Sequence, residues 1–255
     1  MPPSNHTAEK QGLKPGLTPG YLAELRGKDY ERFLICLFTP QAHRDDIAAL
    51  FLFNAELAHI RDQVTEPLLG QIRLQWWREA LDKLGTPEQP PHALLDRLSL
   101  WQQRGISLAP LHTLLDARTT DLQTAPSPTL AAYKAYRHDT SAPLGAILAA
   151  LLRQPGNAAL FAEIMKNYAA IGLLRALPHW LQRRQMPLPP EIIVQYALNT
   201  GALAEFKPQP GLARWALATS RQTMEQCAVL KAKLRSLPRA ERRGASAILL
   251  HNGLT

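Results

Sequence analysis

The sequence predicts an all-α fold, and three observations support this prediction. Apolar residues recur at the helical spacing of three and four positions along most of the 255 residues. Alternating runs of β-branched residues and Asn-Gly hairpin turns, which are typical of strands, are missing. Many of the 21 prolines fall at expected helix starts and in turns, where the proline ring is compatible with a helical fold. A chain with 46% hydrophobic residues can bury a full core in one domain, or at most two.

Prolines and a loop divide the first half of the chain into five expected helices. Thr39 followed by Pro40 is typical of a helix start, with a hydroxyl N-cap and then proline at the first helical position. Pro67 ends that helix at about Thr65, because the residue before a proline avoids the α region. The segment GTPEQPP, 85–91, predicts a loop. The expected helices are 21–38, about 39–65, 68–84, about 92–104 and about 110–124.

The second half of the chain follows the same rules. Ser127 before Pro128 predicts another helix start, and the Pro-Gly pair at 155–156 breaks that helix. Pro178 lies inside the next helical pattern and predicts a kink near Ala176. The last two helices are each preceded by a proline or opened by one. The expected helices are about 127–153, about 158–184, about 190–198, about 210–236 and about 239–251.

The N-terminus and the cysteines narrow the class of protein. Residues 1–20 contain no apolar run and are predicted to form a flexible tail ahead of a single domain over 21–255. This tail resembles neither a signal peptide nor a transit peptide, and no segment reaches the roughly 20 apolar residues that span a bilayer. Cys36 and Cys227 have no metal-ligand spacing, which favours two buried thiols in a reducing compartment over one disulfide. We therefore expect a cytoplasmic protein.

The net charge of +8 predicts attraction to phosphate-bearing partners. Nucleic acid is not expected, because no block of lysines and arginines with interleaved aromatic residues occurs. Diphosphates and anionic lipids remain, as does a solvated basic surface without a dedicated ligand. The basic segments 183–185 and 239–243 leave open a peripheral position on the inner face of a membrane.

The stretch FNAELAHIRDQVTEP, 53–67, resembles a metal-binding acidic helix that has lost most of its acid. Glu56 and Asp62 are six residues apart, so on a helix they point about 120° apart and cannot hold one ion together. Asp62 and Glu66 would share a face, but Glu66 directly precedes Pro67. Magnesium needs several converging oxygen ligands. The stretch therefore predicts at most a weak metal site at Asp62, with a salt-bridged aspartate as the alternative.

Three blocks resemble the squalene/phytoene synthase family. They are ALFLFNAELAHIRD at 49–62, IRLQWWREAL at 72–81 and GLLRALPHWLQRRQMPLPPEII at 172–193, and the resemblance spans about 30–240. It implies the isoprenoid-synthase fold, an all-α bundle with a central cavity between its helices. It also implies head-to-head joining of two prenyl diphosphates, with magnesium held by acidic pairs on two facing helices.

The departures from the family pattern point away from catalysis. Ala58 stands at the first aspartate of the early motif, and Asp62 at the second. On the later helix Ala176 replaces the aspartate after the family arginine, and Trp180 stands at the next acidic position. This pattern is most similar to the branch that contains mitochondrial complex I assembly factor 6 and its bacterial relatives. We expect a non-catalytic assembly-factor-like or isoprenoid- or lipid-binding protein that needs no cofactor. The alternative is an active prenyltransferase with magnesium on Glu56, Asp62 and Glu66.

The resemblance also supplies candidate ligand residues. Arginines can bind a diphosphate directly, which would support binding rather than chemistry. The candidate anion-binding residues are Arg175, Arg183 and Arg184. The candidate cavity-lining residues are Tyr133, Tyr136, Trp77 and His179, with core packing as the alternative for each ring. Trp76 and Trp77 are adjacent on one helix, so at most one of them can face the core squarely.

Overall fold

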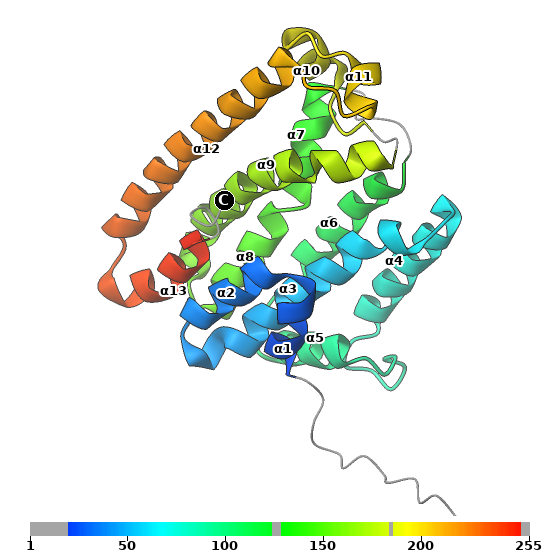
Figure 1. Cartoon of the computed structure of the whole chain (residues 1–255). Coiled ribbons are helices and arrows are strands. Elements are labelled where there is room, and N and C mark those ends of the chain that lie inside the picture. Colours follow the sequence, from blue (N-terminus) through cyan, green and yellow to red (C-terminus); the bar gives the residue numbers. More distant parts are fainter. Residues whose placement is uncertain (1–19, 124–128, 184–185, 251–255) are drawn as a thin grey trace, which may run out of the picture.

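The structure, a computed structural model, describes residues 20–123, 129–183 and 186–250, and within these ranges it consists of helices without a strand (Figure 1). The all-α prediction is confirmed. The helices are α1 (Tyr21–Lys28), α2 (Tyr30–Phe38), α3 (Arg44–His59), α4 (Pro67–Asp82), α5 (Ala93–Gln103), α6 (Ala109–Arg118), α7 (Leu130–Asp139), α8 (Ala142–Leu151), α9 (Ala158–Gln182), α10 (Pro190–Gln195), α11 (Thr200–Ala204), α12 (Pro210–Ser236) and α13 (Arg239–Leu249). Short 3₁₀ turns lie at Gln41–His43, Arg61–Gln63, Thr119–Leu122 and Pro155–Asn157.

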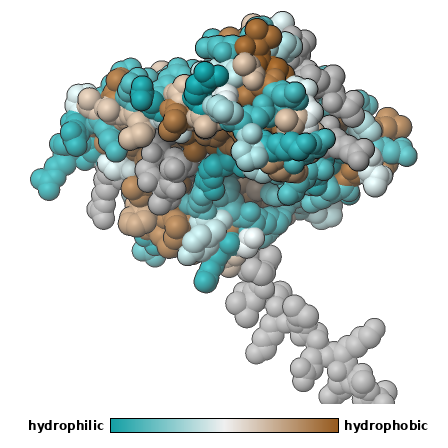
Figure 2. Space-filling view, turned by 45° about the horizontal axis from the view of Figure 1, so that its top comes forward, coloured by the Kyte–Doolittle hydropathy of each residue, from teal (hydrophilic) through white to brown (hydrophobic). Residues whose placement is uncertain are grey.

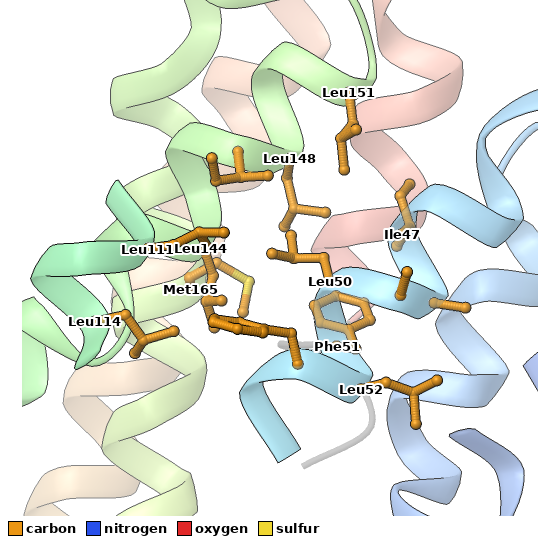
Figure 3. Packing of buried hydrophobic residues seen from close by; sticks show 14 of the residues in the cluster. Ile47, Leu50, Phe51, Leu52, Leu111, Leu114, Leu144, Leu148, Leu151 and Met165 are labelled. Carbon is orange, nitrogen blue, oxygen red and sulfur yellow. The ribbon is translucent and has the colours of Figure 1, made fainter. Parts of the chain in front are cut away.

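Helix α3 lies at the centre of the larger hydrophobic core. Its middle reads IAALFLFNA and is buried on every side, which is the pattern of a helix surrounded by other helices. Figure 3 shows Leu50 and Phe51 of α3 facing Leu144 and Leu148 of α8, with Met165 of α9 beside them. Helices α8 and α9 pack closely along their lengths. The core therefore fixes α3 relative to α9, the helices on which the first and the third family-like blocks lie.

A second, smaller cluster lies where α7 meets α10, α11 and α12 near one end of α9 (Figure 1). Its buried members include Tyr133 of α7, Leu177 of α9 and Trp215 of α12. Helix α12 runs along α9, and α10 and α11 fold over the end of the bundle. This cluster holds α7 and α12 against α9.

Two expected helices are each divided in the structure. The segment 21–38 forms α1 and α2, because the Asp29 side chain accepts a hydrogen bond from the Arg32 backbone N–H (3.0 Å) and caps a new helix start. The segment expected at 127–153 forms α7 and α8, with Pro143 in the first turn of α8, where its missing N–H is tolerated. Helix α11 was not expected, and Asn199 caps its start.

Pro178 lies inside α9, as predicted, and the helix continues past it to Gln182. Several other predictions concern residues outside the described ranges. Almost all of the predicted tail, residues 1–19, lies outside the described ranges. The predicted helix start at Ser127-Pro128, the candidate Arg184 and the last residue of the expected C-terminal helix lie outside them too. Cys36 and Cys227 are both buried thiols, as predicted.

The cap at Asp29 gives a testable effect on stability. The Asp29→Ala variant loses the hydrogen bond to Arg32 N–H and is expected to lower the free energy of unfolding by about 1 kcal/mol. For a chain of this size that corresponds to a fall in Tm of about 2–4 °C, measured by circular dichroism on heating. Asp29→Asn keeps an N-cap acceptor and is the matched control. Equal melting of both variants would contradict the capping role.

The surface mixes polar and apolar side chains. Trp77 is 6% exposed and Trp76 is 40% exposed, so one ring of the pair faces the core, as predicted. Figure 2 shows hydrophilic and hydrophobic residues interspersed over one face of the molecule. Among the described helices, none is both long and apolar enough to span a membrane.

Candidate functional site

The first and the third family-like blocks meet at one hollow of about 250 Å³, which we call the motif hollow. It lies between the end of α3, the 3₁₀ turn after α6, helix α7 and the second half of α9. Ala58 and Ala176, the two positions where the family pattern has aspartate, both line it. Trp180 lines it as well. The places from which two metal-binding carboxylates would project thus carry methyl groups.

Asp62 lies against Arg183 and His179 at the end of the facing helix α9. The expected helix to about Thr65 ends earlier, at His59, so Asp62 lies on the 3₁₀ turn Arg61–Gln63. Arg183 Nη1 lies 2.5 Å from Asp62 Oδ1, and His179 Nε2 lies 3.5 Å from the same oxygen. The structure therefore brings together three of the predicted site residues, but as an ion pair between a candidate metal ligand and a candidate anion-binding residue.

A buried polar network forms the wall opposite α9. Arg118 donates to Asp121 Oδ2 (3.0 Å) and to Asn54 Oδ1 (3.0 Å), and the Tyr136 hydroxyl donates to Asp121 Oδ1 (2.5 Å). Burial and the Asp121 carboxylate both raise the pKa of Tyr136 above its ordinary value. Burial would lower the pKa of Arg118, but Asp121 and Tyr136 together more than offset this and raise it. The network therefore keeps a guanidinium and a neutral phenol beside the hollow.

Arg118 and Asp121 were not predicted from the sequence. They lie on α6 and the following turn, outside the three family-like blocks, and Arg118 meets Asn54 across 64 residues of sequence. Nothing in their local pattern distinguishes them from other helix-terminal charges. Asn54, in contrast, belongs to the first block, and Tyr136 was among the predicted cavity residues.

The remaining predicted residues lie elsewhere. Glu56 pairs with Lys28 of α1, and Glu66 is exposed at the start of α4. Arg175 pairs with Glu31 of α2 at 2.5 Å, and this hydrogen bonding lowers the pKa of the Glu31 carboxyl. Each of these charges is thus bound by a partner outside the motif hollow, or lies away from it.

Two of the predicted cavity-lining aromatic residues, Tyr133 and Trp77, do not line the motif hollow. Tyr133 lines a different hollow between α7, α9, α10 and α12. Trp77 lies in the core, where its ring packs edge-on against Phe53 at 5.1 Å between centroids, and it lines neither hollow. The cause is the helical register, because Trp77 shares the inward face of α4 with Leu74 and Leu81.

The donor set does not fit magnesium. Mg²⁺ takes oxygen ligands in near-octahedral geometry, usually from one or two carboxylates together with substrate phosphates. The two carboxylates of the motif hollow, Asp62 and Asp121, are each engaged by an arginine, and Ala58 and Ala176 offer no ligand. Across the described part of the chain, no group of three or more His, Cys, Asp and Glu residues gathers as a metal site.

Comparisons with known proteins agree with the family resemblance of the three blocks. Residues 25–254 match the family model for squalene/phytoene synthase. Complex I assembly factor 6 from mouse is 29% identical over 193 residues, covering 72% of this chain and 56% of the mouse protein. The human protein of the same name is 28% identical over 191 residues, covering 71% of this chain and 56% of its own length. The chain therefore spans little more than half the length of these relatives.

Solved structures of the same architecture confirm the fold. A dehydrosqualene synthase in complex with a ligand superposes with a TM-score of 0.77 at 16% identity, covering 91% of this chain and 82% of that one. The squalene synthase HpnC from Alicyclobacillus acidocaldarius gives a TM-score of 0.74 at 13% identity, covering 91% and 89%. At these identities the likeness establishes the isoprenoid-synthase fold, and the chemistry depends on the residues of the hollow.

Proposed function

Because the chain belongs to the squalene/phytoene synthase family, yet carries Ala58 and Ala176 at two metal-ligand positions, we propose that it is a non-catalytic member. In this proposal the motif hollow binds the phosphate-bearing head of an isoprenoid or lipid without magnesium, and the protein acts in the assembly of respiratory complex I. The observation that supports it best is the Asp62–Arg183 ion pair between the two motif segments. A carboxylate paired with arginine is a poor magnesium ligand.

Charge and size favour binding of an anionic head over chemistry. The charged residues that line the motif hollow are Arg61, Arg118, Arg183, Asp62 and Asp121, which leaves one positive charge in excess. The Nε atoms of Arg61 and Arg118 are buried without a hydrogen-bond partner, so both can still donate. A hollow of about 250 Å³ is below the roughly 300–1,000 Å³ of typical ligand pockets, which suits one head group better than two prenyl diphosphates.

Calorimetric titration with farnesyl diphosphate and geranylgeranyl diphosphate, with and without MgCl₂, tests the proposal. We expect binding that does not depend on magnesium, and no release of pyrophosphate. Magnesium-dependent binding with turnover would overturn the proposal and restore the alternative, a head-to-head prenyltransferase that uses Glu56, Asp62 and Glu66.

The two functions predict opposite effects of Asp62→Asn. If Asp62 competes with a diphosphate for Arg183, its neutral isostere should strengthen magnesium-independent diphosphate binding about fivefold. This corresponds to roughly 1 kcal/mol for an ion pair whose side chains are 32% and 35% exposed. If Asp62 holds a metal, the same variant should weaken binding. Glu225→Gln, which removes an exposed carboxylate of α12 that belongs to neither proposed site, is the matched control and should leave the Kd unchanged.

The assembly role is supported by similar proteins from mouse, rat, cattle and human that are named complex I assembly factor 6. We propose that the protein lies in the cytoplasm, in peripheral contact with the inner face of the membrane. Loss of the chain in its source organism should lower the amount of assembled complex I. Expression of either the wild type or Asp62→Asn should restore it, whereas rescue by the wild type alone would contradict a non-catalytic role.

A further inference from the structure

A second hollow, of about 470 Å³, lies on the other part of α9, between α7, α10 and α12; we call it the α7–α12 hollow. It shares no lining residue with the motif hollow. Helix α9 contributes Glu163, Lys166 and Asn167 to its wall, and α7 contributes Tyr133, Lys134 and Arg137. Its size is within the range of ligand pockets.

Positive charge concentrates on one side of the α7–α12 hollow. Lys134 and Arg137 are three residues apart on α7 and therefore share a face, and Lys166 of α9 lines the same hollow. The same three cations also line an adjoining hollow of about 440 Å³. Glu163 supplies the carboxylate in the wall of the α7–α12 hollow, and it pairs with Lys166 at 2.8 Å. Lys134 and Arg137 thus remain without a carboxylate partner in the described part of the chain.

Arg137 is oriented by a neighbouring ring, but its Nε–H has no hydrogen-bond acceptor. Its guanidinium lies 5.9 Å from the centroid of the Tyr133 ring, which orients the fork by a cation–π contact. Its Nε atom is buried and has no hydrogen-bond acceptor. A half-buried guanidinium with donors to spare is a natural partner for a phosphate, whose oxygens accept two parallel hydrogen bonds from the fork.

The rest of the wall suits an organic group attached to that phosphate. Tyr133 and Trp215 are 6% and 5% exposed, and they give the hollow a rigid aromatic base. Amide side chains of Gln195, Gln222 and Gln226 line it from α10 and α12. A few polar groups over an aromatic floor fix the orientation of a small ligand.

We propose that the α7–α12 hollow is a second binding site, independent of the motif hollow, for a phosphate ester, either a soluble one or the head group of an anionic lipid. The phosphate binds Arg137 and Lys134 of α7, and its organic part lies against Tyr133 and Trp215. The site needs no metal, because both charges of the phosphate meet cations of the protein.

Calorimetric titration of the full chain with phenyl phosphate tests the soluble source. The double variant Lys134→Gln/Arg137→Gln should raise the Kd at least tenfold. Lys231→Gln/Lys233→Gln, which removes two exposed charges elsewhere on α12, should leave it unchanged. Arg183→Gln, in the motif hollow, should leave it unchanged too, so failure of the proposed function would not affect this result. An equal loss in both double variants would overturn the site.

Co-sedimentation with vesicles of 30% phosphatidylglycerol and 70% phosphatidylcholine tests the lipid source. Vesicle binding that falls in Lys134→Gln/Arg137→Gln and not in Lys231→Gln/Lys233→Gln assigns the site to a lipid head group. Phenyl phosphate binding without vesicle binding assigns it to soluble esters. If the wild type binds neither phenyl phosphate nor these vesicles, the proposal is wrong. Unchanged circular dichroism spectra establish that the double variants are folded.

Discussion

Alanine in place of Gly145 is expected to lower the free energy of unfolding by about 3 kcal/mol, although glycine-to-alanine changes inside helices usually stabilise. A Cβ atom at this position would lie 2.3 Å from the Ala162 backbone nitrogen and 2.5 Å from the Phe161 carbonyl carbon. Both are backbone atoms of α9, so no rotamer change can relieve the overlap. Helices α8 and α9 would have to move apart, and the core that fixes α3 against α9 would loosen.

Gly172→Ala is the matched control, because Gly172 is inside α9 and a Cβ there meets nothing within 4 Å. It should raise the free energy of unfolding by about 0.5–1 kcal/mol through the lost backbone freedom of glycine. Urea denaturation followed by circular dichroism measures both variants. A Gly145→Ala protein as stable as the wild type would show that α8 and α9 are not packed this closely.

These two glycines illustrate what sequence patterns can and cannot predict. Periodicity and prolines predict that 142–151 and 158–182 are helical, because those signals are local. Gly145 and Gly172 look alike in such a pattern, and only the approach of α9 separates them. The break at Asp29 was missed for a related reason: the stripe of apolar residues continues across it, and a single side-chain cap ends one helix and begins another.

In the candidate site, too, local patterns predicted the residues on one helix but not their partners on other helices. Ala58, Asp62, Ala176 and Arg183 were found from the sequence because each lies within a contiguous family-like block. Arg175 lies in the same block, but it turns to Glu31, 144 residues away, since its side chain leaves α9 toward α2. A block pattern predicts which residues share a helix, whereas the partner of each charge depends on which helices become neighbours.

The loss of Asp46 is expected to have an effect as large as that of Gly145→Ala. Asp46 is 3% exposed and accepts hydrogen bonds from Trp101 Nε1 (2.7 Å) and Arg104 Nη1 (2.9 Å), and Arg97 Nε lies 2.7 Å away as an ion pair. Asp46→Ala leaves the buried indole N–H without an acceptor and two guanidinium groups without their carboxylate. The free energy of unfolding should fall by about 3 kcal/mol at pH 7.

Asp45→Ala, one residue earlier and exposed, is the matched control and should stay within about 0.5 kcal/mol of the wild type. The pH dependence gives a further check with a definite sign. Burial raises the pKa of Asp46, but hydrogen bonds from Arg104 and Trp101 together with the charges of Arg97 and Arg104 lower it by more, so its folded pKa lies below its unfolded value. Its contribution is therefore present above the unfolded pKa and is lost as the pH falls through the folded pKa.

Urea denaturation of the wild type and Asp46→Ala at pH 7 and at about pH 3 should thus show a smaller difference at the lower pH, where protonation of the carboxyl begins to remove its charge. The residual difference at acid pH includes the hydrogen bond from Trp101, which a protonated carboxyl still accepts. A difference that stays constant with pH would mean that Asp46 acts through packing and the Trp101 hydrogen bond, without a contribution from its charge. In that case the cations Arg97 and Arg104 would contribute nothing to the stability of the helix pair α3 and α5.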